Sequence, residues 1–313
     1  MRVLTAVSAL ALLAVSCTRE PPLQLVSARF TGTCLSTETK SATDDESSIE
    51  KMELFVFRSD DGQLEARAWG NGSSPLDVTV TRNRNLRWYL IANAPKGRIP
   101  DCTKEEDFLE TTVLLGDGFV MHDQGEVVLR ENNTVINAKL SRYICKVGIG
   151  SIHVDWPDAL PCSVKTVALM SALGSTPISG VPAQLEPIYN CGIIDTDFSG
   201  KLSTSPGVEV NTSLPVNLDI TLWCMPNPSD GDSYGLPWQY RRTRIAICVN
   251  AWGQENWYPI DLPPMEGNRY YSVDDIVIKG PGAPAPDVKP ERVLTSFTVR
   301  VLDWEEETAP AQF

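Results

Sequence analysis

Short strand-like segments, separated by turn residues, run through almost the whole chain after its first residues. In "MELFVF" (52–57), apolar residues occupy both the even and the odd positions, so both faces of one extended segment are apolar. Such a strand has to lie between two packed layers. The 23 prolines and 21 glycines fall largely at the breaks between such segments. This pattern predicts an all-β fold made of two β-sandwich domains in tandem.

The prolines also suggest where the chain divides. Pro157 and Pro161 flank a break in the strand pattern, so we predict an N-terminal domain over 18–156 and a C-terminal domain over 157–313. One segment predicts a short helix instead of a strand. In "CTKEEDFLE" (102–110), Thr103 and Glu106 have the spacing of a capping box.

The first 17 residues, "MRVLTAVSALALLAVSC", have the form of an export signal. Arg2 supplies a positive start, and the 12 apolar or small residues that follow are too few to span a bilayer. Because the segment ends in "LAVSC", we predict a lipobox in which Cys17 becomes the lipidated N-terminus of the mature protein. An ordinary signal peptide cut near Ala14 or Ser16 is the alternative. A lipid on Cys17 would anchor the protein to the outer membrane without spanning it.

Composition excludes several classes of function. With 40 acidic and 27 basic residues the net charge is −13, which disfavours nucleic acid and anionic membrane surfaces as partners. Seven cysteines follow Cys17, with no CxxC pair and only two histidines, so we expect buried thiols or structural bridges and no metal site. No nucleophile-elbow, P-loop or dinucleotide motif occurs, and we predict neither catalytic residues nor a cofactor.

Two further segments are candidate ligand sites. Asp195, Asp197 and Ser199 open a sequence similar to a calcium loop, but Pro206 occupies the position of its bidentate glutamate, which favours a plain turn. The aromatic residues in "AWGQENWYP" could instead form a platform for glycans. The alternative is that these residues close one end of a sandwich, with two of them alternating inward and outward. The three aromatic residues are Trp252, Trp257 and Tyr258.

Five segments in the same order resemble fimbrillins, the lipoprotein-exported FimA-type and Mfa-type subunits of type V pili. They cover most of the mature chain and lie behind the lipobox. They are "IEKMELFVFRSDDGQLE" (49–65), "LRWYLIANAP" (86–95), "VINAKLSRYICKVGI" (135–149), "WYPIDLPPMEGNRYYSVDDIVIKGPGAPAPDVKP" (257–290) and "FTVRVLDWEEE" (297–307).

The resemblance implies two transthyretin-like or Ig-like sandwiches and a structural or adhesive role in a cell-surface fimbria. In that family a protease trims the N-terminal strand, and the vacated groove accepts a C-terminal strand from a neighbouring subunit. Here the lost strand would include 23–30. Arg29 and Lys40 are the candidate cleavage positions, because no arginine occurs between Thr31 and Ser48. The expected partners are other pilus subunits, the outer membrane and a host or bacterial surface receptor.

The donor strand would come from the strongly alternating end of the chain. Its four apolar side chains would contribute about 6–12 kcal/mol on full burial, against an association cost of about 4–15 kcal/mol. In an isolated chain we expect 293–301 to be ordered in a sheet. The short polar tail after it favours an anchor or tip role over a shaft role, and a surface glycan-binding lipoprotein is the alternative function. The donor candidates are Val293, Thr295, Phe297, Val299, Val301 and Trp304.

Overall fold

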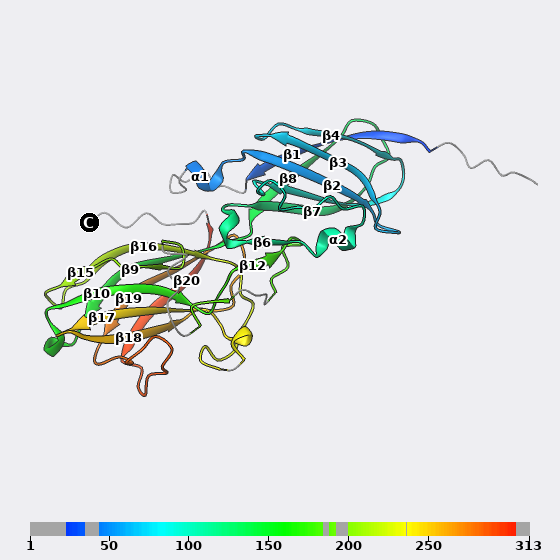
Figure 1. Cartoon of the computed structure of the whole chain (residues 1–313). Helices are drawn as coiled ribbons and strands as arrows, with labels where there is room; N and C mark the ends of the chain where they lie inside the picture. Colours follow the sequence, from blue (N-terminus) through cyan, green and yellow to red (C-terminus); the bar gives the residue numbers. More distant parts are fainter. Residues whose placement is uncertain (1–22, 35–43, 184–187, 192–199, 236, 305–313) are drawn as a thin grey trace, which may run out of the picture.

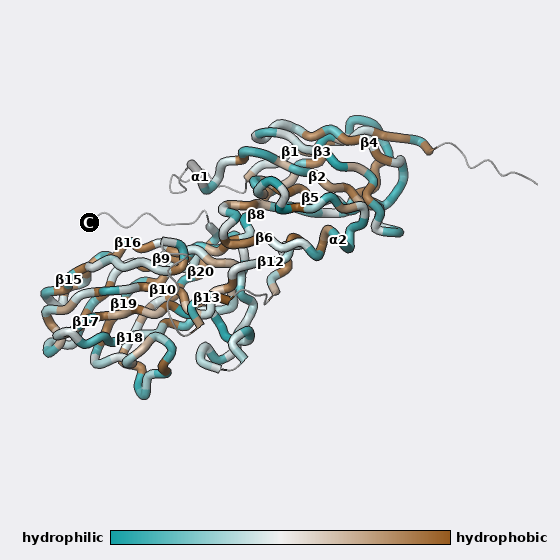
Figure 2. The backbone as a smooth tube through the Cα atoms, viewed as in Figure 1, coloured by the Kyte–Doolittle hydropathy of each residue, from teal (hydrophilic) through white to brown (hydrophobic). Residues whose placement is uncertain are grey.

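The computed structural model describes residues 23–34, 44–183, 188–191, 200–235 and 237–304. The strands gather in two groups that lie end to end, one holding β1 to β8 and the other holding β9 to β20 apart from the short strand β12 (Figure 1). Apolar stretches follow the strands and hydrophilic residues mark many of the connections between them (Figure 2). The all-β prediction is confirmed, and the division into two domains stays a prediction.

The N-terminal group is one long sheet folded over into two layers. Its strands follow the order β3-β2-β5-β7-β8-β1-β4. β7 and β8 pair only at Met121 with Arg142 and at His122 with Ser141, and the sheet turns its corner there. The predicted two-faced strand at 52–57 is confirmed, because its apolar side chains are buried on both faces. The strands are β1 (Leu25–Cys34), β2 (Lys51–Arg58), β3 (Leu64–Asn71), β4 (Leu76–Thr81), β5 (Asn85–Ala92), β7 (Met121–Val128) and β8 (Thr134–Arg142).

The C-terminal group packs two sheets face to face. One has the order β16-β9-β19-β20, and the other has the order β14-β10-β17-β18 with β15 beside β10. The first sheet contains β9 (Cys145–Val154), β16 (Val216–Cys224), β19 (Arg269–Ile278) and β20 (Thr295–Asp303). The second contains β10 (Cys162–Met170), β14 (Ser203–Thr204), β15 (Val208–Val210), β17 (Arg244–Ala251) and β18 (Gln254–Asp261). Strand pairing therefore changes between Arg142 and Cys145, earlier than the predicted boundary at 156/157.

Short elements connect the two groups. β6 pairs with β12, and a single apolar cluster runs from Phe55 and Phe57 in the N-terminal sheet to Trp304 at the end of β20. The core is thus continuous across the junction. The remaining elements are α1 (Asp44–Ser47), α2 (Glu105–Leu109), β6 (Thr112–Leu114), β11 (Ala172–Leu173), β12 (Ser175–Pro177), β13 (Ile188–Tyr189) and three 3₁₀ turns, Leu115–Asp117, Pro157–Ala159 and Trp238–Tyr240.

The predicted helix near 102–110 exists, but its predicted cap does not. Lys104 occupies the N-cap position and no side chain caps the helix, so the capping-box assignment was wrong. Buried contacts hold α2 in place instead. Glu105 forms an ion pair with Arg87 at 2.6 Å and accepts a hydrogen bond from the Tyr89 hydroxyl at 2.7 Å. Packing, not local capping, therefore fixes where this short helix begins.

All seven described cysteines are thiols, and five of them are buried. Cys145 and Cys224 lie directly opposite each other on β9 and β16, and burial raises the pKa of the Cys145 thiol. Within the described ranges, no cluster of three or more His, Cys, Asp or Glu side chains is suited to a metal ion. None of the helices in the described part of the chain combines the length and apolar character needed to cross a bilayer.

His122 gives the fold a sensitivity to acid. It stacks on Tyr143 with 4.1 Å between ring centroids, and burial lowers its pKa from 6.5 to about 4. Between pH 6.5 and 4, the His122 imidazole is protonated in the unfolded chain but stays neutral in the folded chain. The unfolding free energy should therefore fall by up to about 3 kcal/mol from this group as pH drops from 6.5 to 4. Urea titrations across that window should show a correspondingly smaller fall for His122→Gln, with values at pH 8 as the baseline. An identical fall in both proteins would contradict the prediction.

Candidate functional site

The first strand, β1, lies inside a sheet and not at its edge. It runs parallel to β8, where Phe30 lies beside Ile136, and antiparallel to β4, where Phe30 lies beside Leu76. Its alternating residues Val26, Ala28 and Phe30 are buried in the core between the two layers. Phe30 meets Trp88 of the opposite layer edge-on, with ring centroids 5.5 Å apart. The predicted first strand is thus a central part of the N-terminal sheet.

Gly32 brings β1 very close to the opposite layer. A Cβ atom at this position would lie 2.5 Å from Met52 Sδ and 3.0 Å from Leu140 Cδ1, both closer than ordinary carbon contacts allow. Only glycine fits here while Met52 keeps its position. Along its inward face β1 therefore carries Val26, Ala28, Phe30 and Gly32, and this order of side-chain sizes defines the shape of the groove that β1 fills.

The outward face of β1 carries the candidate cleavage residue Arg29. Its guanidinium forms an exposed ion pair with Asp77, with Nε 2.8 Å from Oδ1, and this contact lowers the pKa of Asp77. The Arg29 side chain is accessible, but its backbone lies between Asp77 on β4 and Val135 on β8. A protease that binds its substrate in an extended form would need β1 to leave the sheet first. Lys40 and Cys17 lie outside the described residues.

The last strand, β20, occupies the edge of its sheet. It pairs with β19, and among the described residues no other strand lies beside it. Val299 and Val301 lie opposite the buried residues Val273 and Tyr271, so these side chains face the interior. Coverage on this side is incomplete, however. Val301 remains 49% exposed and Phe297 36% exposed. β20 therefore has a free edge and an apolar face that its own domain covers only in part.

The expectation that 293–301 is ordered in a sheet is confirmed from Thr295 onward, and Val293 precedes the strand. Val293 and Phe297 line a cavity of about 240 Å³ with Pro259 of β18 and Lys289. β18 and β20 are each the last strand of their sheet, so the cavity lies beside the edges of the two sheets. The apolar residues at the start of the candidate donor segment are thus accessible.

Trp304 differs from the other donor candidates because it is fully buried. Its Nε1 atom donates a hydrogen bond to Glu46 Oε2 at 3.3 Å, and Lys146 Nζ lies 3.3 Å from the same oxygen. The Arg142 guanidinium stacks 4.9 Å from the indole and donates through Nε to the Glu46 carbonyl oxygen. Trp304 therefore fixes the end of β20 against α1, which belongs to the segment that follows β1.

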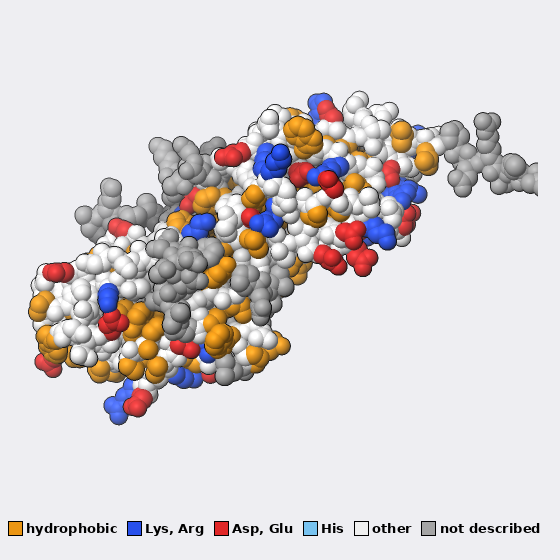
Figure 3. Space-filling model, viewed as in Figure 1, with side chains coloured by type: hydrophobic (Ala, Val, Ile, Leu, Met, Phe, Trp, Pro, Cys, Tyr) orange, Lys and Arg blue, Asp and Glu red, His pale blue; other side chains and the backbone are white. Residues whose placement is uncertain are grey.

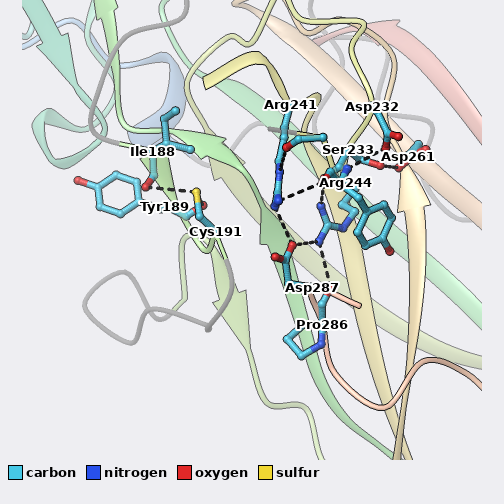
Figure 4. A network of polar contacts seen from close by, with 12 residues as sticks. Ile188, Tyr189, Cys191, Asp232, Ser233, Arg241, Arg244, Asp261, Pro286 and Asp287 are labelled. Carbon is cyan, nitrogen blue, oxygen red and sulfur yellow. Dashed lines mark hydrogen bonds and ion pairs between the residues drawn. The ribbon is translucent and has the colours of Figure 1, made fainter. Parts of the chain in front are cut away.

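A second polar cluster holds the segment that leads into β20. Arg241 and Arg244 are both buried, and both point at the carboxylate of Asp287, at 2.7 and 2.9 Å (Figure 4). Arg244 also donates to the carbonyl oxygen of Pro286 at 3.0 Å. Arg241 follows the 3₁₀ turn Trp238–Tyr240 and Arg244 begins β17, so two cations from 241–244 bind one anion of the 280–294 segment. We refer to Arg241, Arg244 and Asp287 as the arginine clasp.

The first and last strands also match each other in sequence. "VSARFTG" (26–32) aligns with "VLTSFTV" (293–299), with Val, Phe and Thr shared at three positions. In β1 the shared Val26 and Phe30 face the core, and Thr31 donates to Asn137 Oδ1 at 2.6 Å. The segment at 293–299 thus carries the inward pattern of β1, with Thr295 in place of Ala28 and Val299 in place of Gly32.

The predicted glycan platform is not formed. Trp257 packs with Met170 and Cys248 on the outer side of β17 and β18, whereas Tyr258 is buried between the two sheets. Trp252 alone of the three is exposed, at the turn between β17 and β18. The predicted alternation of Trp257 and Tyr258 is confirmed, although both lie in the middle of β18 and not at an end of the sandwich, and the shared platform was wrong. Asp195, Asp197 and Ser199, the calcium-loop candidates, lie outside the described residues.

No family model matches the sequence, and no curated protein matches it. Solved structures do match. A candidate cell adhesion protein from Bacteroides eggerthii has a TM-score of 0.62 at 16% identity, covering 91% of this chain and 97% of that chain. Fimbrilin FimA from Porphyromonas gingivalis has a TM-score of 0.59 at 11% identity, covering 89% and 97%. The tip fimbrial protein Mfa3 from Porphyromonas gingivalis, with a C-terminal truncation, has a TM-score of 0.55 at 13% identity, covering 90% and 100%. The structure therefore has the fold of fimbrial proteins, as the sequence resemblance implied.

Proposed function

We propose that this chain is a structural or adhesive subunit of a cell-surface fimbria that joins its neighbours by exchanging β-strands. The fold shared with fimbrial proteins supports the location and the role. The observation that carries the exchange mechanism is the match between 26–32 and 293–299. A groove shaped for Val26, Ala28 and Phe30 would accept Val293, Thr295 and Phe297 from another copy in the same register.

Loss of β1 would leave an open groove in the N-terminal sheet that favours binding of another strand. Both of its neighbours, β4 and β8, would lose a ladder partner, and three apolar side chains would leave the core. An extended strand would bind the open groove with high affinity, because it would form hydrogen bonds with the unpaired backbone groups and fill the apolar groove at the same time. Val299 would occupy the place of Gly32, so Met52 and Leu140 would have to move aside. Both contacts are with flexible side chains.

The donor side is suited to release. β20 lies at an edge, so removing it breaks one ladder, whereas removing a central strand breaks two. Its inward face is already half open at Phe297 and Val301. Burial of these side chains in a neighbour's groove would add apolar contact that the monomer lacks. The proposed exchange therefore moves a strand that is paired on one side into a groove that pairs it on both sides.

Export and processing complete the proposal. A lipid on Cys17 would hold the subunit at the outer membrane. Cleavage at Lys40 would remove all of β1, whereas cleavage at Arg29 would remove the strand only as far as Arg29. Because Arg29 is paired on both sides, cleavage there would be slow in the folded protein. An uncut subunit would keep both its strand and its anchor, which suits an anchor position. Assembly partners would be other subunits of the same fimbria.

The proposal is tested with a fluorescent peptide of residues 291–304. Limited trypsin treatment of the purified chain, with the product that begins at position 41 identified by N-terminal sequencing, gives protein lacking all of β1 (Leu25–Cys34). In fluorescence anisotropy, we expect the peptide to bind this trimmed protein and not to bind intact protein. A Phe297→Asp peptide should lose at least tenfold in affinity, since its charge would enter the Phe30 pocket.

A Ser296→Asp peptide is the matched control, because position 296 maps to Arg29 and faces outward. It should bind like the unmodified peptide. Equal binding of the Phe297→Asp peptide, or no binding of any peptide to trimmed protein, would refute the proposed register. Absence of SDS-resistant oligomers after trimming of the full chain would refute exchange itself.

A further inference from the structure

A cleft of about 770 Å³ lies on the outer face of the N-terminal sheet, away from β1. Its floor consists of outward residues of three neighbouring strands. In the ladder, Glu53 of β2 lies between Trp69 of β3 and Ile91 of β5. The segment 93–101 forms one wall, with Lys96, Ile99 and Asp101 lining the space. The cleft therefore combines a rigid strand-built floor with a wall that follows directly from β5.

Trp69 is the most unusual residue of this cleft. It is 74% exposed although it belongs to a regular strand, and its neighbours on the same face are charged or polar. A large aromatic ring left in water on a rigid floor provides a flat apolar surface for a ligand. No contact within the described residues requires an indole at this position.

The charges of the cleft favour an anionic ligand. Both of its carboxylates are already engaged by one cation, because Arg67 binds Glu53 at 2.6 Å and Asp101 at 2.5 Å. The side chains of Lys51 and Lys96 have no carboxylate partner among the described residues. The lining thus carries three cations and two anions in a chain whose net charge is −13. On the face shown in Figure 3, the N-terminal group mixes basic and acidic side chains.

We propose that this cleft binds an acidic saccharide, a pyranose that bears a carboxylate, such as a sialic or uronic acid. The apolar face of the ring would stack on Trp69, and the carboxylate would bind Lys51 and Lys96. Glu53 and Asp101 keep acceptor oxygens for ring hydroxyls. A nucleic acid is disfavoured because its many phosphates would meet the chain's overall negative charge. The site goes beyond the proposed assembly role and gives the subunit a surface for attachment.

The test uses 3′-sialyllactose, a glucuronic acid disaccharide and neutral lactose as probes. Saturation-transfer NMR and tryptophan fluorescence on the full chain should detect at least one acidic sugar, bound at least tenfold more tightly than lactose. Trp69→Ala should weaken that binding at least tenfold. Trp252→Ala is the matched control, since Trp252 is similarly exposed, at 67%, but lies on the C-terminal group. This control should bind as the unmodified protein does.

The charge part has its own readout. Lys51→Gln combined with Lys96→Gln should remove the preference for acidic sugars and the salt dependence of binding. Failure of both acidic probes to bind, or unchanged binding by Trp69→Ala, would overturn the proposal. The proposal would also be overturned if Trp69→Ala abolished binding of the 291–304 peptide, because the cleft would then hold a strand and not a sugar. The assembly role stands or falls separately, since peptide binding at the β1 groove should be unaffected by Trp69→Ala.

Discussion

Replacing Asp287 by asparagine should lower the unfolding free energy by about 2–4 kcal/mol. Asparagine keeps the shape of the side chain but removes the negative charge that both buried guanidiniums contact. Breaking a fully buried pair typically costs about 3–5 kcal/mol, because the partner charge stays buried without compensation. The effect is smaller here since the Asp287 side chain is 26% exposed. Two uncompensated cations make the loss large all the same, and a melting temperature about 5–10 °C lower is expected.

Lys289→Gln is the matched control for this substitution. Lys289 lies in the same segment and pairs with Asp232 at 3.2 Å, but both side chains are exposed. Exposed pairs contribute about 0–1 kcal/mol, so this variant should melt close to the unmodified protein. Equal effects of the two substitutions would mean that the arginine clasp does not fix the segment before β20. Asp287→Asn should also weaken the attachment of β20, the proposed donor strand, to its own domain.

The sequence predicted best what depends on neighbouring residues. The apolar run at 52–57 and the first strand, predicted over 23–30 and found at Leu25–Cys34, follow from local side-chain patterns. The helix at Glu105–Leu109 was also expected, but packing and not the predicted cap holds it. The pairing partners of the strands could not be predicted from these local patterns, because they are set by contacts between residues far apart in the chain. β9 belongs to the C-terminal sheet although it directly follows β8 in sequence. Nothing in the composition of β9 distinguishes one sheet from the other.

The contacts of the candidate site residues were missed for a similar reason. Trp304 was expected in a strand that serves a neighbour, yet Glu46 binds it from 258 positions away. Glu46 lies in the polar segment 36–48, whose sequence carries no pattern that would reveal this contact. Two signals could have been used. An isolated tryptophan at an outward position, Trp69, suggests a ligand surface. The basic run at 241–244 in an acidic chain suggests a buried anion, which proved to be Asp287.

Phe30→Ala should speed tryptic cleavage after Arg29 by about 10²–10³-fold. Removing a buried phenylalanine costs about 3–5 kcal/mol, and Phe30 lies between the two layers against Trp88. Cleavage follows the population of molecules in which β1 has left the sheet, provided that the strand opens and closes quickly. Every 1.4 kcal/mol lost from the closed state then raises the rate tenfold. The rate is measured by electrophoresis and by sequencing of the fragment that begins at position 30.

Two further variants separate strand release from other effects. Met52→Ala removes a contact with β1 from the opposite layer and leaves the cleavage sequence unchanged, so it should accelerate the same cut. Leu25→Ala removes a side chain from β1 itself, but Leu25 is mostly exposed, and the rate should stay within about threefold because little burial is lost. Equal rates in all variants would mean that Arg29 is cut without release of β1. In that event the groove would not open by trimming at this residue, and cleavage at Lys40 would become the remaining route to strand exchange.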